Sequence, residues 1–213
     1  MSRPRYARLV GLLGLVIAAV VVVSTLLGRS DGATGIAPGQ RLAPFAVPLA
    51  LGTLQGDANI ATHAHEGSAG NVPACSVRGV QVLNVCELYE QGPVVLALFV
   101  EDGGCPTVLG EMQALVASYP EVHFAAVAIG GQRSRLRRLV RSRHLSLPVG
   151  IDADGALVSL YKVFSCPQVN FAFPDGVVQS KALLGTPSPA ALRARVGQLV
   201  AASRVRDGQG GGA

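Results

Sequence analysis

The sequence predicts an α/β domain in which helices cover both faces of a mixed central sheet, preceded by one N-terminal transmembrane helix. Residues 93–100 are a continuous apolar run of strand length, which is typical of buried parallel strands, and residues 122–129 predict a second buried strand. Between them, residues 107–119 place apolar side chains at helical spacing, so the three segments form a strand–helix–strand unit. Residues 9–28 form an uncharged apolar run that is long enough to span a bilayer.

The N-terminal run has the features of an uncleaved membrane anchor. Twenty residues at helical rise span roughly 30 Å, about one hydrocarbon core. Arg3, Arg5 and Arg8 precede the run, which predicts a cytoplasmic segment 1–8 and a domain on the outer side of the plasma membrane. A cleaved signal peptide is the alternative, but it has a shorter apolar core and a small-x-small cleavage site. We therefore expect a single-pass protein with an extracytoplasmic domain.

The rest of the chain divides by composition. Residues 29–40 are rich in Gly, Ala and Pro and predict a flexible linker. The folded domain is expected over 41–203, with a leading strand within 43–51 and a polar, Gly-rich insertion at about 55–86. The Gly-rich tail 204–213 is expected to be disordered.

The second half of the domain continues the alternation of helices and strands. Residues 133–145 predict an amphipathic helix with Leu136, Leu139, Val140 and His144 inward and its six arginines on a solvated outer face; a contact with anionic lipid or an acidic partner is the alternative. A strand and turn are expected at 147–155, followed by a short helix.

The last two elements carry specific local signals. Residues 169–184 predict a hairpin that turns at Pro174-Asp175-Gly176. Ser188 and Pro189 then supply the N-cap and the first position of a final helix.

Four cysteines fall in the predicted exported domain, namely Cys75, Cys86, Cys105 and Cys166. Disulfides persist outside the cytoplasm, so an even cysteine number is consistent with two bonds, and four cysteines allow three pairings. No C-x-x-C occurs, and the spacings fit no zinc site, so neither a metal nor an organic cofactor is predicted. Three of the arginines that contribute to the net charge of +5 belong to the N-terminal topology signal, so the charge alone is weak evidence for an acidic partner. No nucleic-acid partner is predicted.

Cys105 lies where the first apolar strand gives way to the following helix. The free N–H groups and the dipole of a helix N-terminus favour thiolate over thiol, and Pro106 suits the first helical turn, where no N–H is needed. A buried structural cysteine is the alternative reading. The position favours a redox nucleophile.

Cys75 and Cys86 are close in sequence and lie upstream of the first core strand. A disulfide that closes so short a loop removes roughly 3 kcal/mol of unfolded-state entropy. We interpret the pair as a structural disulfide that holds the insertion. The alternative is that one of them is a mobile resolving cysteine for Cys105.

Over 41–203 the chain resembles the thioredoxin-like superfamily, specifically the exported redoxin group with TlpA-type proteins and alkyl-hydroperoxide-reductase/thiol-specific-antioxidant domains. The first core strand with Cys105 resembles the active-site strand and helix of that group. GIDADGALVSLYKV (150–163) resembles its approach to the substrate loop, and CPQVNFAFPDG (166–176) resembles the loop with a cis-proline, the next strand and its turn glycine.

The departures from the family pattern concern the active-site motif. Val108 stands where a C-x-x-C has its second cysteine, and Gly103-Gly104 replace the preceding tryptophan. The motif CPTVLGE also resembles that of peroxiredoxins, which have a threonine where this chain has Asp102. A carboxylate there raises the pKa of a thiol, and residues 167–173 lack the arginine that such enzymes bring to the thiolate. A thiol peroxidase is therefore the weaker reading.

The resemblance implies a displaced redox partner for Cys105. In this fold the residue before the cis-proline lies against the attacking cysteine, so Cys166 is expected to pair with Cys105. Pro167, Pro106 and Asp102 are expected to border the substrate groove.

The predicted function is a membrane-anchored, extracytoplasmic thiol–disulfide oxidoreductase. Cys105 attacks a substrate disulfide, and Cys166 or a cysteine of another protein resolves the mixed disulfide. The expected partners are protein thiols and disulfides, as substrate and reductant, and the membrane through residues 9–28. The alternatives are a peroxiredoxin-like thiol peroxidase and a non-catalytic redoxin-fold binding protein held by two disulfides.

Overall fold

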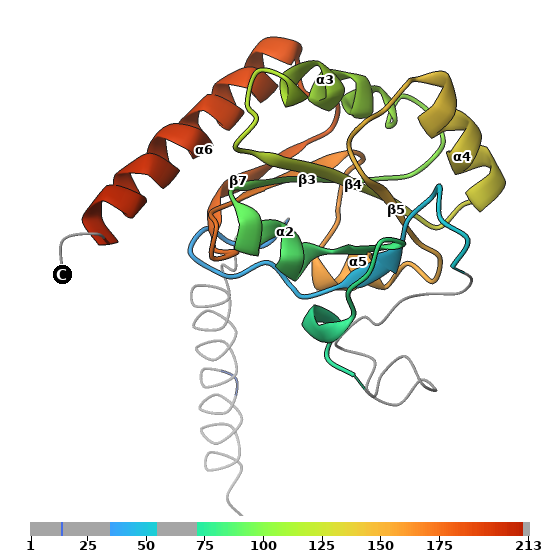
Figure 1. The fold of residues 1–213 in the computed structure, drawn as a ribbon, viewed down its shortest axis with the longest axis horizontal. Helices are drawn as coiled ribbons and strands as arrows, with labels where there is room; N and C mark the ends of the chain where they lie inside the picture. The colour runs from blue at the N-terminus through green and yellow to red at the C-terminus, as the bar shows by residue number, and fades with distance from the viewer. Residues whose placement is uncertain (1–13, 15–34, 55–71, 211–213) are drawn as a thin grey trace, which may run out of the picture. The chain divides into compact units, whose positions relative to one another are not determined.

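The central sheet of the domain has five strands in the order β5-β4-β3-β6-β7 (Figure 1). The computed structural model describes residue 14 and residues 35–54 and 72–210. The strands are β3 (Val94–Phe99), β4 (His123–Ile129), β5 (Val149–Asp152), β6 (Gln168–Ala172) and β7 (Val178–Leu184). Strands β3, β4 and β5 are parallel, whereas β6 is antiparallel to β3 and to β7. The predicted mixed sheet is confirmed.

Helices cover both faces of this sheet (Figure 1). They are α2 (Val85–Gln91), α3 (Thr107–Val116), α4 (Arg133–Ser142), α5 (Ala156–Leu160) and α6 (Pro189–Gly210). Alternate residues of β3 enter two separate cores. Val95 and Phe99 pack with α3, α4 and α6, whereas Leu96 and Leu98 pack with α2 and α5. Burial on both faces explains why β3 is apolar throughout rather than alternating.

The hairpin and the final helix begin and end as their local signals predict. Val177 N donates to the Asp175 carboxylate at 3.0 Å, and Gly176 has a φ of +79°. A Cβ at Gly176 would lie 2.8 Å from the Tyr89 ring, so both backbone conformation and space require glycine there. At the start of α6, Ala191 N donates to the Ser188 hydroxyl at 3.2 Å, which is the predicted N-cap.

A second, two-stranded sheet joins the leading segment to the insertion. β1 (Ala46–Pro48) pairs antiparallel with β2 (Val82–Asn84), after the short 3-10 helix η2 (Ala74–Ser76). The leading strand is thus confirmed. It continues to β5, because Leu49 bridges Gly150 and Ala50 N donates to Val149 O at 2.8 Å. Within the insertion, residues 55–71 lie outside the described residues.

The predicted linker is wrong for residues 35–40, which pack on the domain. Gly35 is buried, and its N–H donates to Lys162 O at 3.1 Å. Gly39 N donates to Val178 O at 2.9 Å, so the segment satisfies backbone groups beside β7. Residues 29–34 lie outside the described residues.

The predicted disordered tail is wrong for residues 204–210, because α6 continues to Gly210. Arg204 forms an ion pair with Glu121 at 2.9 Å. Arg206 pairs with Asp175 at 2.9 Å, and its guanidinium lies 4.2 Å from the centroid of the Phe173 ring. These contacts tie the polar last turns to the domain.

His144 does not face the core as predicted. Helix α4 ends at Ser142, and His144 is exposed with a φ of +50°. Leu145 N donates to Val140 O and His144 N to Arg141 O, which is a Schellman ending. His144 itself adopts the left-handed conformation that ends the helix, so its side chain does not continue the inner face of α4.

Over residues 35–54 and 72–210, no helix is long and apolar enough to cross a membrane. The predicted basic segment 1–8 lies outside the described residues, and so does the predicted anchor 9–28 except for Gly14.

Candidate functional site

Cys105 lies in the turn that connects β3 to α3, directly ahead of the helix. Thr107 N and the Thr107 hydroxyl both donate to Gly104 O, at 3.1 and 2.5 Å, which folds this turn tightly. Pro106 is buried at the start of α3, and Cys105 itself is partly exposed. The cysteine is therefore within reach of solvent at a helix N-terminus, as the sequence predicts.

Cys166 approaches from the loop between α5 and β6. The Cys166–Pro167 peptide bond is cis, and Pro167 is buried. The Cys166 sulfur accepts a hydrogen bond from Val100 N at 3.2 Å, which places it at the end of β3. Two segments far apart in sequence thus meet at one edge of the sheet.

The structure joins Cys105 and Cys166 in a disulfide with a Cα–Cα distance of 5.5 Å across 61 residues of sequence. This is the pairing that the family resemblance implied. Both cysteines are partly exposed, so a partner's sulfur can approach this bond. Val108, in the position of the missing second cysteine, has no exposed surface and packs in the core under α3.

Two successive hydrogen bonds of buried residues connect the strand that follows the Cys166 loop to the rest of the domain. The Gln168 amide donates to Tyr161 O at 3.0 Å, and the Tyr161 hydroxyl donates to Ala43 O at 2.8 Å. Burial, and to a lesser degree Tyr89, raises the pKa of Tyr161 well above its usual value, so this hydroxyl stays a donor. The only sign of these supports in the sequence is a glutamine, Gln168, inside an apolar strand.

Two carboxylates precede Cys105, and both face Arg135 of α4. Asp102 is exposed and lies 3.5 Å from the Arg135 guanidinium. The Glu101 side chain is only 4% exposed and lies 3.6 Å from it. A Cβ on Gly131, whose φ is +86°, would lie 2.7 Å from the Glu101 carboxylate, so the backbone approaches this acid closely. Asp102 is a predicted neighbour of the site, whereas Glu101 and Arg135 were not predicted to lie beside it.

The arginines of α4 and its C-cap are only partly solvated, in contrast to the prediction. Arg133 donates to Leu49 O, and Arg137 donates to Ala50 O and Gly52 O. Arg143 donates to Pro106 O, next to Cys105. The solvated face is confirmed for Arg138 and Arg141, which are exposed and whose side chains have no hydrogen bond or ion pair among the described residues.

The Cys75–Cys86 disulfide lies on the other side of the sheet. Its Cα–Cα distance is 5.3 Å, and Cys86 is fully buried in the first turn of α2. Asn84 holds the surroundings together: its side-chain oxygen accepts from Cys86 N, and its amide donates to Ala74 O. Cys86 belongs to the core beneath α2 and α5, whereas Cys105 packs against the opposite core. The sheet therefore separates the two disulfides.

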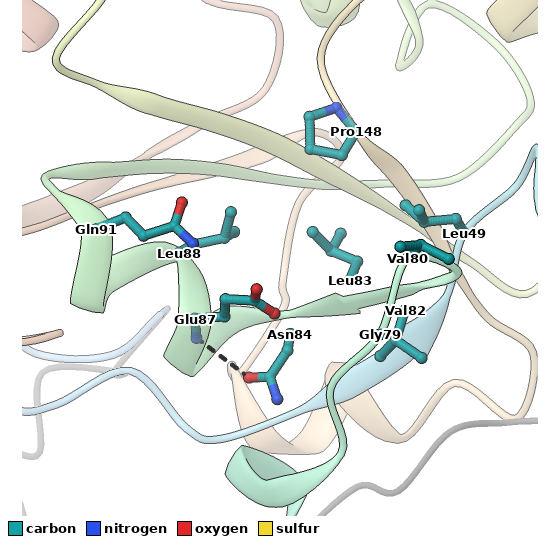
Figure 2. Close-up of a pocket in the computed structure, with 10 residues that line it drawn as sticks. All are labelled: Leu49, Gly79, Val80, Val82, Leu83, Asn84, Glu87, Leu88, Gln91 and Pro148. Atoms are coloured by element: carbon teal, nitrogen blue, oxygen red, sulfur yellow. Dashed lines mark hydrogen bonds between the residues drawn. The ribbon is translucent and has the colours of Figure 1, made fainter.

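A cavity of about 360 Å³ lies beside the small sheet (Figure 2). It is lined by β2, α2 and Pro148, with aliphatic side chains and the polar groups of Asn84, Glu87 and Gln91. None of the four cysteines lines it. In the part of the chain that the structure describes, no group of three or more His, Cys, Asp or Glu side chains could hold a metal ion.

Comparison with solved structures shows a thioredoxin-like fold. A structure described as the thiol:disulfide interchange protein DsbE of Chlorobium tepidum has a TM-score of 0.58 at 16% identity, over 79% of this chain and 98% of its own. A thiol-disulfide oxidoreductase from Bacteroides fragilis has a TM-score of 0.54 at 14% identity, over 75% and 99%. Peroxidoxin BcpB from Mycobacterium tuberculosis has a TM-score of 0.55 at 15% identity, over 80% and 97%.

These likenesses concern the fold. The chain has a thioredoxin-like fold, as the sequence resemblance predicted. No family model matches the sequence, and no curated protein is significantly similar to it.

Proposed function

We propose that this protein is a thiol–disulfide oxidoreductase with Cys105 and Cys166 as its redox pair. The observation that carries the proposal is the partly exposed Cys105–Cys166 disulfide, formed between a strand–helix junction and the loop that ends in cis-Pro167. The fold agrees with this chemistry, because two structures of the same fold are named as a thiol:disulfide interchange protein and a thiol-disulfide oxidoreductase.

Cys105 is the attacking residue in the proposed reaction. In the reduced protein, its thiolate attacks one sulfur of a partner disulfide, that S–S bond breaks, and the partner's other sulfur leaves as a thiolate. The position at the start of α3, a ten-residue helix, favours the thiolate form of Cys105. A mixed disulfide between Cys105 and the partner results.

Cys166 resolves that mixed disulfide. Its thiolate attacks the Cys105 sulfur, the bond to the partner breaks, and the second partner thiolate leaves and takes up a proton. Two electrons have then passed to the partner, and the Cys105–Cys166 bond is restored. The hydrogen bond from Val100 N to the Cys166 sulfur supports this role, because it stabilises negative charge on that sulfur. A thiol protein supplies the electrons for the next cycle.

The proposed location is the outer side of the plasma membrane. The uncharged run 9–28 after Arg3, Arg5 and Arg8 supports an anchor with a cytoplasmic N-terminus. Two disulfides in one domain support an oxidising compartment. Protease treatment of intact cells should therefore degrade the domain, whereas a domain protected until lysis contradicts the proposal.

Trapping of the mixed disulfide tests the proposed chemistry. The full-length Cys166→Ser variant in detergent, incubated with an unfolded disulfide-containing substrate, should accumulate a covalent adduct at Cys105 that reductant releases. Cys105→Ser should form none, and Cys75→Ala/Cys86→Ala should turn over like the wild type. An adduct on Cys166 in the Cys105→Ser variant, or no adduct in either, contradicts the assignment.

A further inference from the structure

Helix α4 brings positive charge to the loop that carries Cys105. The loop itself contributes two carboxylates, on Glu101 and Asp102, and Arg135 lies within 4 Å of both. At the other end of the helix, Arg143 donates to the carbonyl of Pro106, the residue after Cys105. The acids would otherwise place two negative charges within four residues of a sulfur that has to become negative itself.

The buried acid makes the charge balance matter more than a surface ion pair would. The Glu101 side chain is 4% exposed, and its two oxygens have no hydrogen-bond partner among the described residues. A buried carboxylate is weakly screened by solvent, so its field extends to nearby groups and needs a compensating charge. Arg135 is the cation placed to compensate it, and Asp102, which is 85% exposed, is screened by water.

Other charged groups near Cys105 do not take over this role. Helix α3 carries Glu111, which adds negative rather than positive charge. Residues 163–169, the loop of Cys166, contain no charged side chain, and Lys162 before it is exposed. Among the described residues, Arg135 and Arg143 are therefore the cations that contact the Cys105 loop.

We propose that Arg135 is a positioning residue for the exchange reaction: it offsets one of the two negative charges of Glu101 and Asp102, chiefly that of the buried Glu101, so that the Cys105 thiolate forms next to a loop with less net negative charge. The inference rests on the proposed function of Cys105 as a nucleophile. It changes the sequence-based reading of Asp102, whose carboxylate was expected to oppose thiolate formation. Because Arg135 does not touch the reacting sulfur atoms, its effect is electrostatic and appears in the titration of Cys105.

The test is the pH dependence of Cys105 alkylation in full-length protein that carries Cys166→Ala. With the Cys75–Cys86 bond intact, Cys105 is then the single free thiol. The rate of reaction with iodoacetamide, measured from pH 4 to 10, follows the thiolate fraction and gives the pKa of Cys105. We expect Arg135→Gln to slow alkylation at pH 7 by roughly three- to tenfold, equivalent to a rise of about half to one pKa unit.

Matched variants separate charge from structure. Arg138→Gln, on the exposed side of the same helix, should leave the profile unchanged. Adding Glu101→Gln and Asp102→Asn to Arg135→Gln should restore at least the wild-type rate, since both acids are then removed. An unchanged profile for Arg135→Gln overturns the proposal, and so does a slowed rate that the triple variant fails to restore.

Two further measurements cover the remaining outcomes. If Arg135→Gln does not fold, as judged by circular dichroism, Glu101→Gln/Asp102→Asn with Arg135 present should lower the pKa of Cys105 and speed alkylation at acidic pH; an unchanged rate overturns the proposal. The alkylation assay needs no redox partner. A protein with the expected pKa changes but no mixed-disulfide adduct would refute the exchange function, and only the electrostatic effect of Arg135 on the Cys105 thiol would stand.

Discussion

Removing the Cys75–Cys86 disulfide should destabilise the domain without abolishing thiol–disulfide exchange. The bond closes a loop with a sequence separation of 11, so the chain-entropy model gives a stabilisation of about 3 kcal/mol. For a domain of this size, 1 kcal/mol lowers the melting temperature by about 2–4 °C. We therefore expect Cys75→Ala/Cys86→Ala to melt roughly 6–12 °C below the wild type, on the same chain-entropy estimate.

The assay combines unfolding with activity. Far-ultraviolet circular dichroism under non-reducing conditions gives the melting temperature, and substrate reduction at 25 °C gives the exchange rate. Cys105→Ser/Cys166→Ser is the comparison, because it should lose the exchange rate entirely. The reasoning is refuted if the Cys75→Ala/Cys86→Ala variant stays folded at 25 °C but no longer turns over, since one of these cysteines would then resolve the mixed disulfide. An unchanged melting temperature would refute the structural role.

Three further predictions concern the core, the buried tyrosine and the alternative activity. Leu109→Ala, at a fully buried position of α3, should lower the free energy of unfolding by about 2–5 kcal/mol in urea denaturation. Tyr161 has a raised pKa in the folded state, so its contribution to stability is present below about pH 10 and is lost as the pH rises further. Tyr161→Phe should therefore lose less free energy of unfolding than the wild type between pH 9 and 11. An equal loss in both proteins contradicts the assignment. Cys166→Ser, which retains Cys105, should consume hydrogen peroxide no faster than Cys105→Ser; faster turnover would support a thiol peroxidase.

Periodicity and composition predict the main frame of the fold. The strands β3 and β4 follow from apolar runs, because burial on both faces leaves no polar position in β3 and only the half-buried His123 at the start of β4. The hairpin follows from Pro174-Asp175-Gly176, and the start of α6 from the cap at Ser188. These signals are local, so a single sequence contains them.

Long-range pairings are the part that the sequence does not predict. The partners of Arg133 and Arg137 are backbone carbonyls more than 80 residues away, which leave no trace in residue type. The same applies to the packing of residues 35–40 beside β7. A charged helix therefore looks solvated from its sequence even where the fold supplies acceptors for it.

In the candidate site, too, the local features can be predicted from the sequence and the long-range contacts cannot. The helix N-terminus behind Cys105 follows from the apolar run and Pro106, whereas the pairing with Cys166 depends on the family resemblance. Glu101 was missed because a carboxylate at the end of a strand is usually exposed. Its burial depends on the close approach of Gly131 and on Arg135, which belong to a different element.

The redox titration of both disulfides tests the central claim most directly. Full-length protein is equilibrated in glutathione or dithiothreitol buffers of known potential, alkylated, and mapped by mass spectrometry. The account predicts that Cys105–Cys166 is reduced in the range of exchange enzymes, roughly −120 to −270 mV, while Cys75–Cys86 stays oxidised until below about −300 mV. If Cys105–Cys166 also resists reduction to below about −300 mV, both bonds are structural and the protein is no exchange enzyme.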